Sequence, residues 1–285
     1  MHRLTLKILS AYLAVTAVAL AVTGTSASLT AVHALAIVAL VATGRSRAPW
    51  ARRVSDVLPL VVAPLLYFEV PLLIAALGTT YHDASVQAWE EVIFRGQPAR
   101  RMGAALPWWP VSELLHAAYA NYYLVIFVPT LLVYYRGARR AYEETLFAMT
   151  ATFLVSYVLF VLFPVQGPRY LWSPDVVTDG PFRTLTHALL SRGSARGAAF
   201  PSLHMAGAVT QAVMAWRYQR RLAPWIALAA ALIGVGAVYG GFHYAIDIVA
   251  GAALGAAVGA LALFHARIRL PGVRPAFAGD AADIS

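Results

Sequence analysis

Residues 200–207 read FPSLHMAG, and this stretch decides what the rest of the chain must be. His204 opens an apolar run that carries no charged residue until Arg217. A run of this kind is typical of a membrane helix, and an ionisable side chain in such a helix is costly and usually functional. The surrounding sequence must therefore show whether the run crosses a membrane and why a histidine stands at its start.

The composition indicates a polytopic membrane protein. Of the 285 residues, 60% are hydrophobic and 12% are charged, whereas soluble domains carry about 25% charged residues. The net charge of +9 comes almost entirely from arginine, because Lys7 is the only lysine. In such a chain arginines are typical of cytoplasmic loops, so we expect no nucleic-acid partner. The absence of cysteine excludes disulfides and thiolate metal sites.

Eight apolar stretches approach or reach the length of about 20 residues that a membrane span needs. They are residues 5–23, 27–43, 57–78, 114–135, 145–165, 203–217, 223–240 and 243–265. We therefore expect an all-α bundle with two N-terminal spans over 1–43, a membrane-embedded core over 57–265 and a disordered cytoplasmic tail over 266–285. The alternative for residues 1–27 is a cleavable signal peptide, which would leave seven spans.

Basic segments set the expected orientation. With eight spans, both termini and the loops 44–53, 136–140 and 217–221 fall on one side, and all five segments are rich in arginine or contain Lys7. This side should be the cytoplasm. The long loops 79–113 and 166–202 then lie outside, so we expect a bacterial inner-membrane protein whose site faces the periplasm.

Three ionisable residues of the spans converge on one outer pocket. His204 and His243 lie at the outer ends of the sixth and eighth spans, and Asp247 follows His243 by four residues on one helix face. Glycines at four-residue spacing in GAALGAAVG, residues 251–259, allow the eighth helix to pack closely. Asp247 can fix the tautomer of His243 and leave its other nitrogen to attack, while His204 can protonate a leaving group.

An anion site is expected beside these histidines. The helix that begins at residues 201–204 offers free N–H groups at Ser202 and Leu203, and the Ser202 hydroxyl can add to them. The stretch FPVQGPRY, residues 163–170, ends the fifth span on the same side and presents Arg169, a residue suited to bidentate phosphate binding. These features together predict phosphoryl transfer through a phosphohistidine.

The other ionisable residues of the spans are expected to be structural. His33 is a lone histidine in an alanine-rich helix, and His265 can extend to the cytoplasmic surface. Glu69, in the middle of the third span, must be protonated or paired, and the first interpretation is a hydrogen bond between helices. An accessory role for Glu69 stays open.

The two long outer loops are predicted to contribute to the site. VQAWEEVIF, residues 86–94, has apolar residues at helical spacing, so it can lie flat at the membrane surface with Trp108 and Trp109 as anchors. The alternative is an ordinary interfacial loop. The polar loop 166–202 lies between two motifs and is the better candidate for selecting a headgroup.

The motifs resemble those of the type 2 phosphatidic acid phosphatase superfamily. That family carries a basic motif, then Pro-Ser-Gly-His, then Ser-Arg followed after five residues by His-x-x-x-Asp. Here residues 201–204 read Pro-Ser-Leu-His, and His243 and Asp247 supply the end of the third motif. Residues 236–237 are Gly-Ala in place of Ser-Arg, and the basic motif is reduced to Gly-Pro-Arg at 167–169.

These departures resemble one branch, the inositol phosphorylceramide synthase-like inositolphosphotransferases. Phe200, Tyr239 and Tyr244 match that branch, and Tyr239 is kept as a possible accessory residue. The stretches EVIFRGQPAR at 91–100 and YANYY at 119–123 are also similar to it.

The resemblance implies a role for each site residue. His243 would be the nucleophile, Asp247 its orienting partner, and His204 the general acid and then the base that activates the acceptor. The phosphate would be held by Arg169 and the backbone of Ser202 and Leu203, without a metal or other cofactor. The missing arginine of the third motif would be replaced by one of three loop arginines, Arg183, Arg192 or Arg196.

The resemblance also implies a lipid phosphotransferase or phosphatase. Its substrate would be a phospholipid or polyprenyl phosphate in the bilayer, and its acceptor a lipid, as in sphingolipid synthesis, or a polyol. One alternative is a phosphatase that passes the phosphoryl group of phosphatidic acid or a polyprenyl diphosphate to water. Two others are a metal-dependent hydrolase with His204, His243 and Asp247 as zinc ligands, and a transporter or scaffold without enzymatic activity.

Overall fold

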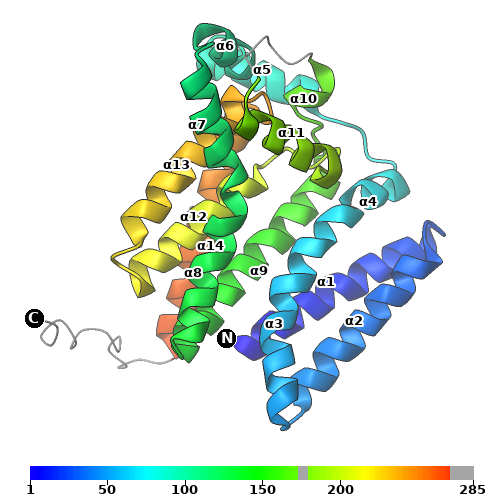
Figure 1. Ribbon diagram of the computed structural model, residues 1–285. Coiled ribbons are helices and arrows are strands. Elements are labelled where there is room, and N and C mark those ends of the chain that lie inside the picture. The colour runs from blue at the N-terminus through cyan, green and yellow to red at the C-terminus, as the bar shows by residue number, and fades with distance from the viewer. Residues whose placement is uncertain (173–178, 270–285) are drawn as a thin grey trace, which may run out of the picture.

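The computed structural model describes residues 1–172 and 179–269, and its regular elements there are helices (Figure 1). All eight expected spans are helical. They are α1 (His2–Val22), α2 (Ala27–Arg45), α3 (Pro49–Leu65) continued by the 3₁₀ turn η1 (Leu66–Glu69) and α4 (Val70–Leu77), α7 (Trp109–Ala120) with α8 (Tyr122–Tyr135), α9 (Arg139–Leu162), α12 (Leu203–Tyr218), α13 (Ala223–Tyr239) and α14 (Ala245–Arg269).

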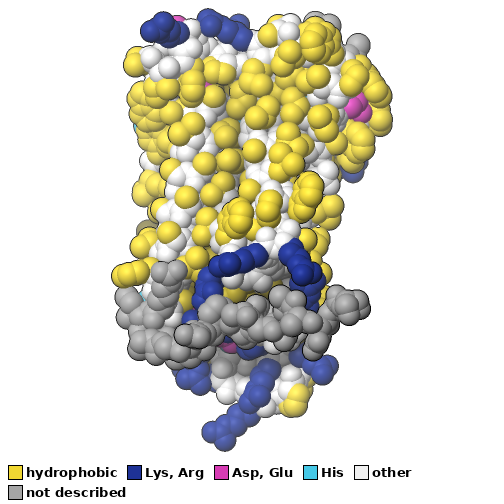
Figure 2. Space-filling model, turned by 90° about the vertical axis from the view of Figure 1, so that its left-hand side faces the viewer, with side chains coloured by type: hydrophobic (Ala, Val, Ile, Leu, Met, Phe, Trp, Pro, Cys, Tyr) yellow, Lys and Arg dark blue, Asp and Glu magenta, His cyan; other side chains and the backbone are white. Residues whose placement is uncertain are grey.

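The described helices confirm an all-α, multi-pass membrane bundle. Five of them, with α3, η1 and α4 taken as one, are long and apolar enough to cross a membrane, and the α7–α8 pair, bent by 42°, makes up to six. Helices α12 and α13, with 16 and 17 residues, are shorter than a full span. Figure 2 shows hydrophobic side chains over the middle of one face and Lys and Arg side chains toward its two ends.

Proline accounts for the interruption of the third span. Pro59 and Pro64 lie inside α3, and Pro71 is near the start of α4. Each proline removes an N–H donor and crowds the preceding turn. The chain therefore passes through the 3₁₀ turn η1, which brings the buried Glu69 into the middle of the span.

Four shorter helices cover one end of the bundle: α5 (Asp83–Phe94), α6 (Pro98–Ala105), α10 (Pro168–Leu171) and α11 (Pro181–Gly193) (Figure 1). The α2–α3, α8–α9 and α12–α13 connections, which carry the arginine-rich loops, lie at the opposite end. The two kinds of loop are thus separated as the sequence predicts. Which end faces the cytoplasm stays a prediction.

Glycines allow α14 to pack directly on α12. A Cβ atom added at Gly251 would lie 2.4 Å from the carbonyl oxygen of Ser202, and one added at Gly255 would lie 2.3 Å from that of Ala206. A Cβ at Gly259 would meet Val213 at 2.9 Å. Larger side chains would separate the helices, so this glycine row fixes the distance between the start of α12 and the start of α14.

The two N-terminal helices pack against the core and do not stand apart from it. Leu9 and Leu13 of α1 are buried in the main hydrophobic cluster. His33 of α2 lies with its Nε2 atom 2.7 Å from Oε2 of Glu69, and both side chains are buried. The expectation of a lone His33 therefore misses its partner, because the two residues are distant in sequence.

The end of the chain differs from the predicted boundary. Helix α14 continues to Arg269, although the eighth span was expected to end at residue 265 and a tail to begin at 266. The remainder of the predicted tail, residues 270–285, lies outside the described residues.

Candidate active site

His243 and Asp247 form a buried pair between α13 and α14. His243 lies in the turn before α14, and Asp247 lies in the first turn of that helix. The Nδ1 atom of His243 is 3.3 Å from Oδ2 of Asp247, which also accepts a hydrogen bond from the N–H of Tyr244 at 2.9 Å. The carboxylate therefore holds the Nδ1 side of the ring and leaves Nε2 for chemistry.

His204 lies against His243 from a different helix. It is the second residue of α12, and the centroids of the two imidazole rings are 5.7 Å apart in an edge-to-face arrangement. Tyr119 and Tyr122 pack on His204 with ring centroids at 4.8 and 4.4 Å, and the Tyr119 hydroxyl is 3.4 Å from a ring nitrogen. His204 is therefore packed against two tyrosine rings and lies next to His243.

Ser202 links the two helices that carry the histidines. Its hydroxyl caps α12 by accepting the N–H of Met205 at 3.4 Å, and its own N–H donates to the carbonyl oxygen of Asp247 at 2.9 Å. The N–H of Ser202 is thus engaged within the protein, whereas its hydroxyl, which acts as an acceptor here, keeps its proton for another partner. The phosphate-binding role of Ser202 and Leu203, at the start of α12, stays a prediction.

Arg169 is held near the histidines by a folded loop. Val165 pairs with the chain near Ala198, accepting the N–H of Ala199 at 3.0 Å and donating to Gly197 at 3.1 Å. Asp83 of α5 accepts the N–H groups of Gln166 and Gly167, each at 3.0 Å. These bonds fix the position of α10, which carries Arg169.

Asp83 also connects this loop to the third motif. Its Oδ1 atom accepts a hydrogen bond from the hydroxyl of Tyr244 at 3.2 Å, and Tyr244 follows His243 directly. Glu90 lies on the same face of α5 as Asp83 and accepts the N–H of Ile246 at 3.2 Å. The helix predicted to lie at the membrane surface therefore contacts both the loop that carries Arg169 and the start of α14 beside His243.

Burial raises the pKa of Glu90 to about 7, although the N–H groups of Ile246 and Ala245 act in the opposite direction. Glu90 is fully buried beneath the start of α14. Its carboxyl group consequently changes charge near neutral pH, next to the helix terminus that carries Asp247.

Two cavities are lined by His204, and a third, larger one adjoins them. The smallest, of about 30 Å³, is lined by His204, His243, Arg169 and Phe242, among others. Arg169 and Phe242 also line a larger cavity of about 500 Å³, and His204 also lines an apolar cavity of about 160 Å³. The histidine pair thus lies between a large polar space and an apolar one.

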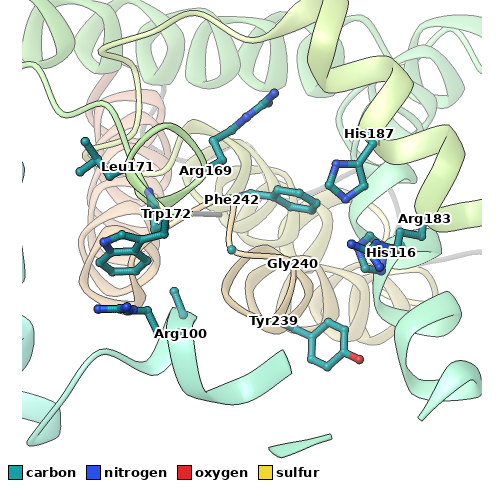
Figure 3. Close-up of a pocket in the computed structure, with 13 residues that line it drawn as sticks. Arg100, His116, Arg169, Leu171, Trp172, Arg183, His187, Tyr239, Gly240 and Phe242 are labelled. Carbon is teal, nitrogen blue, oxygen red and sulfur yellow. The ribbon is translucent and has the colours of Figure 1, made fainter. Parts of the chain in front are cut away.

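The large cavity is strongly basic. Figure 3 shows Arg100 and Trp172 on one side and Arg183, His116 and His187 on the other, with Phe242 between them. Arg100 comes from α6 and lies 5.0 Å from the centre of the Trp172 ring. Burial lowers the pKa of His187, and Arg183 adds to the effect.

The apolar cavity opens between α3, η1 and α8. Tyr67, Tyr119, Tyr122, Phe153 and Tyr157 are among its aromatic walls. Its rim includes side chains that are exposed on the apolar surface of the bundle, namely Leu65, Phe68, Tyr123 and Leu189. A hydrocarbon chain can therefore reach His204 from the side of the bundle.

The three arginines expected to replace the missing motif arginine lie in different places. Arg183 lines the basic cavity and is 3.5 Å from the exposed Asp179. Arg196 is exposed and donates to the side chain of Gln166 at 2.6 Å. Arg192 is exposed on α11 and does not line the described cavities. Arg183 is the candidate that the geometry favours.

The remaining candidates have other positions. The ring of Tyr239 lines the basic cavity, and its hydroxyl donates to the carbonyl oxygen of Leu106 at 2.8 Å. Glu69 pairs with His33 and lines none of the described cavities, so the geometry gives it no contact with the site.

Sequence reasoning overlooked Arg100, His116, His187 and Asp83. Arg100 ends the stretch 91–100, which resembles the inositolphosphotransferase branch, so this arginine could have been proposed as a site residue. The two histidines lie outside the motifs, and only the fold brings them together, with ring centroids 5.9 Å apart. Asp83 was overlooked because an acidic residue is common in the first turn of a helix, and Asp83 lies in the first turn of α5.

The zinc alternative requires three side chains that face one point. Instead, the Asp247 carboxylate faces Nδ1 of His243 and the N–H of Tyr244, so it lies behind His243. Among the described residues, no group of three or more His, Asp and Glu side chains has a metal-binding arrangement.

The comparison with family models gives a match over residues 97–261 to the model described as the PAP2 superfamily. The chain belongs to the PAP2 superfamily. The matched part runs from the end of α5 to α14 and contains both histidines, Asp247 and Arg169. Neither the curated proteins nor the solved structures gave a match.

Membership in the PAP2 superfamily supports an enzyme of the lipid-phosphatase type that acts on lipid phosphates in the bilayer. The match begins at residue 97, so helices α1 to α5 lie before it. The match does not assign the chain to a branch of the superfamily, so membership in the inositolphosphotransferase branch stays a prediction.

Proposed function

We propose that this PAP2 protein is a lipid phosphotransferase that cleaves a lipid phosphoester through a phosphohistidine and passes the phosphoryl-containing group to an alcohol. The observation that carries the proposal is the position of the histidine pair. His204 borders an apolar cavity suited to a lipid chain, and Arg169 borders a large basic cavity suited to a polar substrate.

In the first step, Nε2 of His243 attacks phosphorus and the bond from phosphorus to the leaving oxygen breaks. The leaving oxygen takes a proton from His204, so it departs as an alcohol. Asp247 holds Nδ1 of His243 and stabilises the positive charge that develops on the ring. Arg169 and the N–H groups at the start of α12 neutralise the phosphate oxygens.

In the second step, an acceptor hydroxyl approaches from the basic cavity. His204, now neutral, removes the proton of the hydroxyl as its oxygen attacks phosphorus. The phosphorus–nitrogen bond breaks and His243 is restored. Both steps use the same residues in opposite directions, so no cofactor is needed for the balance of protons and electrons.

The second candidate function is a phosphatase that uses water in this second step. The catalytic residues serve water and alcohol equally well. The basic cavity has a volume of about 500 Å³. A water molecule occupies roughly 30 Å³ in the liquid, so the cavity favours a larger acceptor.

The deciding experiment uses purified protein in detergent with EDTA. Labelled phospholipids and polyprenyl phosphates are supplied with and without ceramide, diacylglycerol or inositol. A new phospholipid that forms only with an acceptor supports the transferase, and free phosphate without one supports the phosphatase. Both products should be lost in His243→Ala and kept in His265→Ala, which changes a histidine at the far end of α14.

Three outcomes contradict the proposal. Turnover that is unchanged in His243→Ala would remove the histidine pair from the chemistry. Activity that EDTA abolishes and zinc restores would favour the metal-dependent hydrolase. Transport of a lipid or polar solute that persists in His243→Ala, without any turnover, would favour a transporter.

A further inference from the structure

We propose that the basic cavity binds a polyol that carries an anionic group of its own, such as a second phosphate, in addition to the group that is transferred. This inference deepens the proposed function by naming the class of the polar substrate. It rests on three features of the cavity: its charge, one buried acceptor atom and its shape.

The cavity is lined by more arginines than the one that also borders the histidines and can bind the transferred phosphate. Arg169 borders both the histidines and the cavity, so it can serve the reacting group. Arg100 and Arg183 line the cavity and do not line the small space at the histidines. Arg183 lies 3.5 Å from the exposed Asp179. Arg100 lies over the Trp172 ring, so Arg100 is the cation of the cavity that a second anionic group can use.

Arg100 and Arg183 belong to different elements and are each held in place. The guanidinium of Arg100 is stacked over Trp172. Glu113 accepts the backbone N–H groups of Phe182 and Arg183 at 2.8 and 3.0 Å and so fixes the first turn of α11. The Trp172 ring thus orients the Arg100 guanidinium, and Glu113 fixes the backbone from which Arg183 extends. An oriented guanidinium is suited to a phosphate or carboxylate.

His116 supplies a buried acceptor. Its side chain is 2% exposed, and its Nδ1 atom lies 2.7 Å from the carbonyl oxygen of Ser112. A carbonyl can only accept, so Nδ1 carries the proton, and in the neutral ring Nε2 is an acceptor. Nε2 has no hydrogen-bond partner among the described residues, although His116 lines the cavity.

A buried acceptor without a partner is costly, and a ligand hydroxyl would satisfy it. A carboxylate or sulfate alone would not, because neither carries a proton at neutral pH. The cavity therefore presents cations for an anionic group and an acceptor for a hydroxyl group. A phosphorylated polyol has both, and the volume of about 500 Å³ leaves room for a molecule of that size.

The test measures binding in the His243→Ala variant, so that no turnover occurs. Glycerol 3-phosphate and inositol 1-phosphate are compared with glycerol, inositol, inorganic phosphate and sulfate by calorimetry. The phosphorylated polyols should bind at least about tenfold more tightly than the free polyols, since hydrogen bonds to charged groups contribute about 1.5–3 kcal/mol.

Two variants separate the parts of the site. Arg100→Gln should weaken binding of the phosphorylated polyols and of inorganic phosphate by about tenfold. His116→Phe should weaken the binding of polyols and leave that of sulfate unchanged, because sulfate has no proton to donate to Nε2. Arg101→Gln is the matched control, because Arg101 is exposed on the same helix, outside the cavity, and bonds to the carbonyl of Arg95 at 3.1 Å.

A second arm identifies the source of the polyol. Short-chain phosphatidylinositol phosphate and short-chain phosphatidylinositol are compared in the same way. If the soluble phosphorylated polyols bind more tightly and this depends on Arg100, the cavity binds the acceptor. If only the phosphorylated lipid binds more tightly, the cavity binds the headgroup of the donor. Either result supports the proposal. Equal binding of phosphorylated and free polyols, or an equal loss in Arg101→Gln, overturns it.

Failure of this inference can be told from failure of the proposed function. If wild-type protein turns over lipids but shows no preference for the anionic polyols, the inference is wrong and the function stands. If the preference is found but no lipid is turned over, the cavity is a binding site and the proposed reaction is wrong.

Discussion

Asp247 is the residue whose contribution is most specific, because it contacts His243 and lines none of the described cavities. Asp247→Asn keeps the size of the side chain but removes the negative charge beside Nδ1 of His243. We expect turnover to fall by about 10²–10⁴-fold, the range typical of proton-transfer and orienting groups, with unfolding temperature changed little. The measurement is the single-turnover rate of phosphoryl transfer.

The control is Glu91→Gln, which changes an exposed acid on α5. Its rate should match that of the wild type. An Asp247→Asn rate within about twofold of the wild type would show that Asp247 does not orient His243 for catalysis.

Glu90 gives the molecule a pH dependence that can be isolated. Burial raises the pKa of Glu90 to about 7 from its ordinary value of 4.5, so the folded state binds this proton more tightly than the unfolded state does. The resulting stabilisation is complete below about pH 4.5 and is lost as the pH rises toward 7.

Thermal unfolding in detergent between pH 5 and pH 8 measures this effect. The unfolding temperature of the wild type should fall relative to that of Glu90→Gln as the pH rises. A constant difference between the two proteins across this range would show that Glu90 does not titrate there.

The glycine row of α14 is the feature of the helices that the site depends on most. Gly255→Val would place a side chain against the carbonyl of Ala206, where even a Cβ atom comes within 2.3 Å. We expect the free energy of unfolding to fall by about 1–3 kcal/mol from overpacking. Turnover should fall as well, because α12 carries His204 and α14 carries Asp247.

The matched change is Ala256→Val, one residue along the same helix on its exposed face. Its stability and turnover should remain near those of the wild type in detergent. Equal effects of the two substitutions would mean that the close contact of α12 and α14 does not matter.

The sequence predicted the helices well, because long apolar stretches leave few alternatives in a membrane. It also predicted which helix ends meet, since the histidines and Asp247 stand at the start of α12 and α14. It did not predict the contacts of α5. Asp83 and Glu90 bond to backbone groups more than 80 residues away in sequence, and no local pattern encodes such contacts.

At the scale of the whole molecule, the same limit explains the pairing of His33 with Glu69 and the basic cavity. Each was assembled from residues on separate elements, and the spacing of residues along the chain says little about them. Arg100 and Arg183 illustrate this, since they come from α6 and α11 and line one cavity. The separation of arginine-rich loops from the site end was predictable, because it follows from composition alone.

The orientation in the membrane can be tested cleanly because the chain contains no cysteine. Single cysteines are introduced at exposed positions at opposite ends, Arg192→Cys on α11 and Arg220→Cys in the α12–α13 connection. In bacterial cells with a permeabilised outer membrane, a membrane-impermeant maleimide should label Arg192→Cys only. Labelling should extend to Arg220→Cys after the inner membrane is lysed.

The opposite pattern would place the histidines on the cytoplasmic side. Labelling of both positions in intact spheroplasts would contradict a single orientation. A cysteine-free wild type is the background control in each case.

The most direct test of the central claim, that His243 carries the phosphoryl group, is to trap the covalent intermediate. Protein in detergent is mixed with a lipid substrate labelled in its phosphate, quenched in alkali within one turnover, and examined for labelled protein by peptide mapping. We predict an alkali-stable, acid-labile label on His243 that is absent from His243→Ala and present in His265→Ala. A label on another residue, or turnover by the wild type without any labelled protein, would contradict the account.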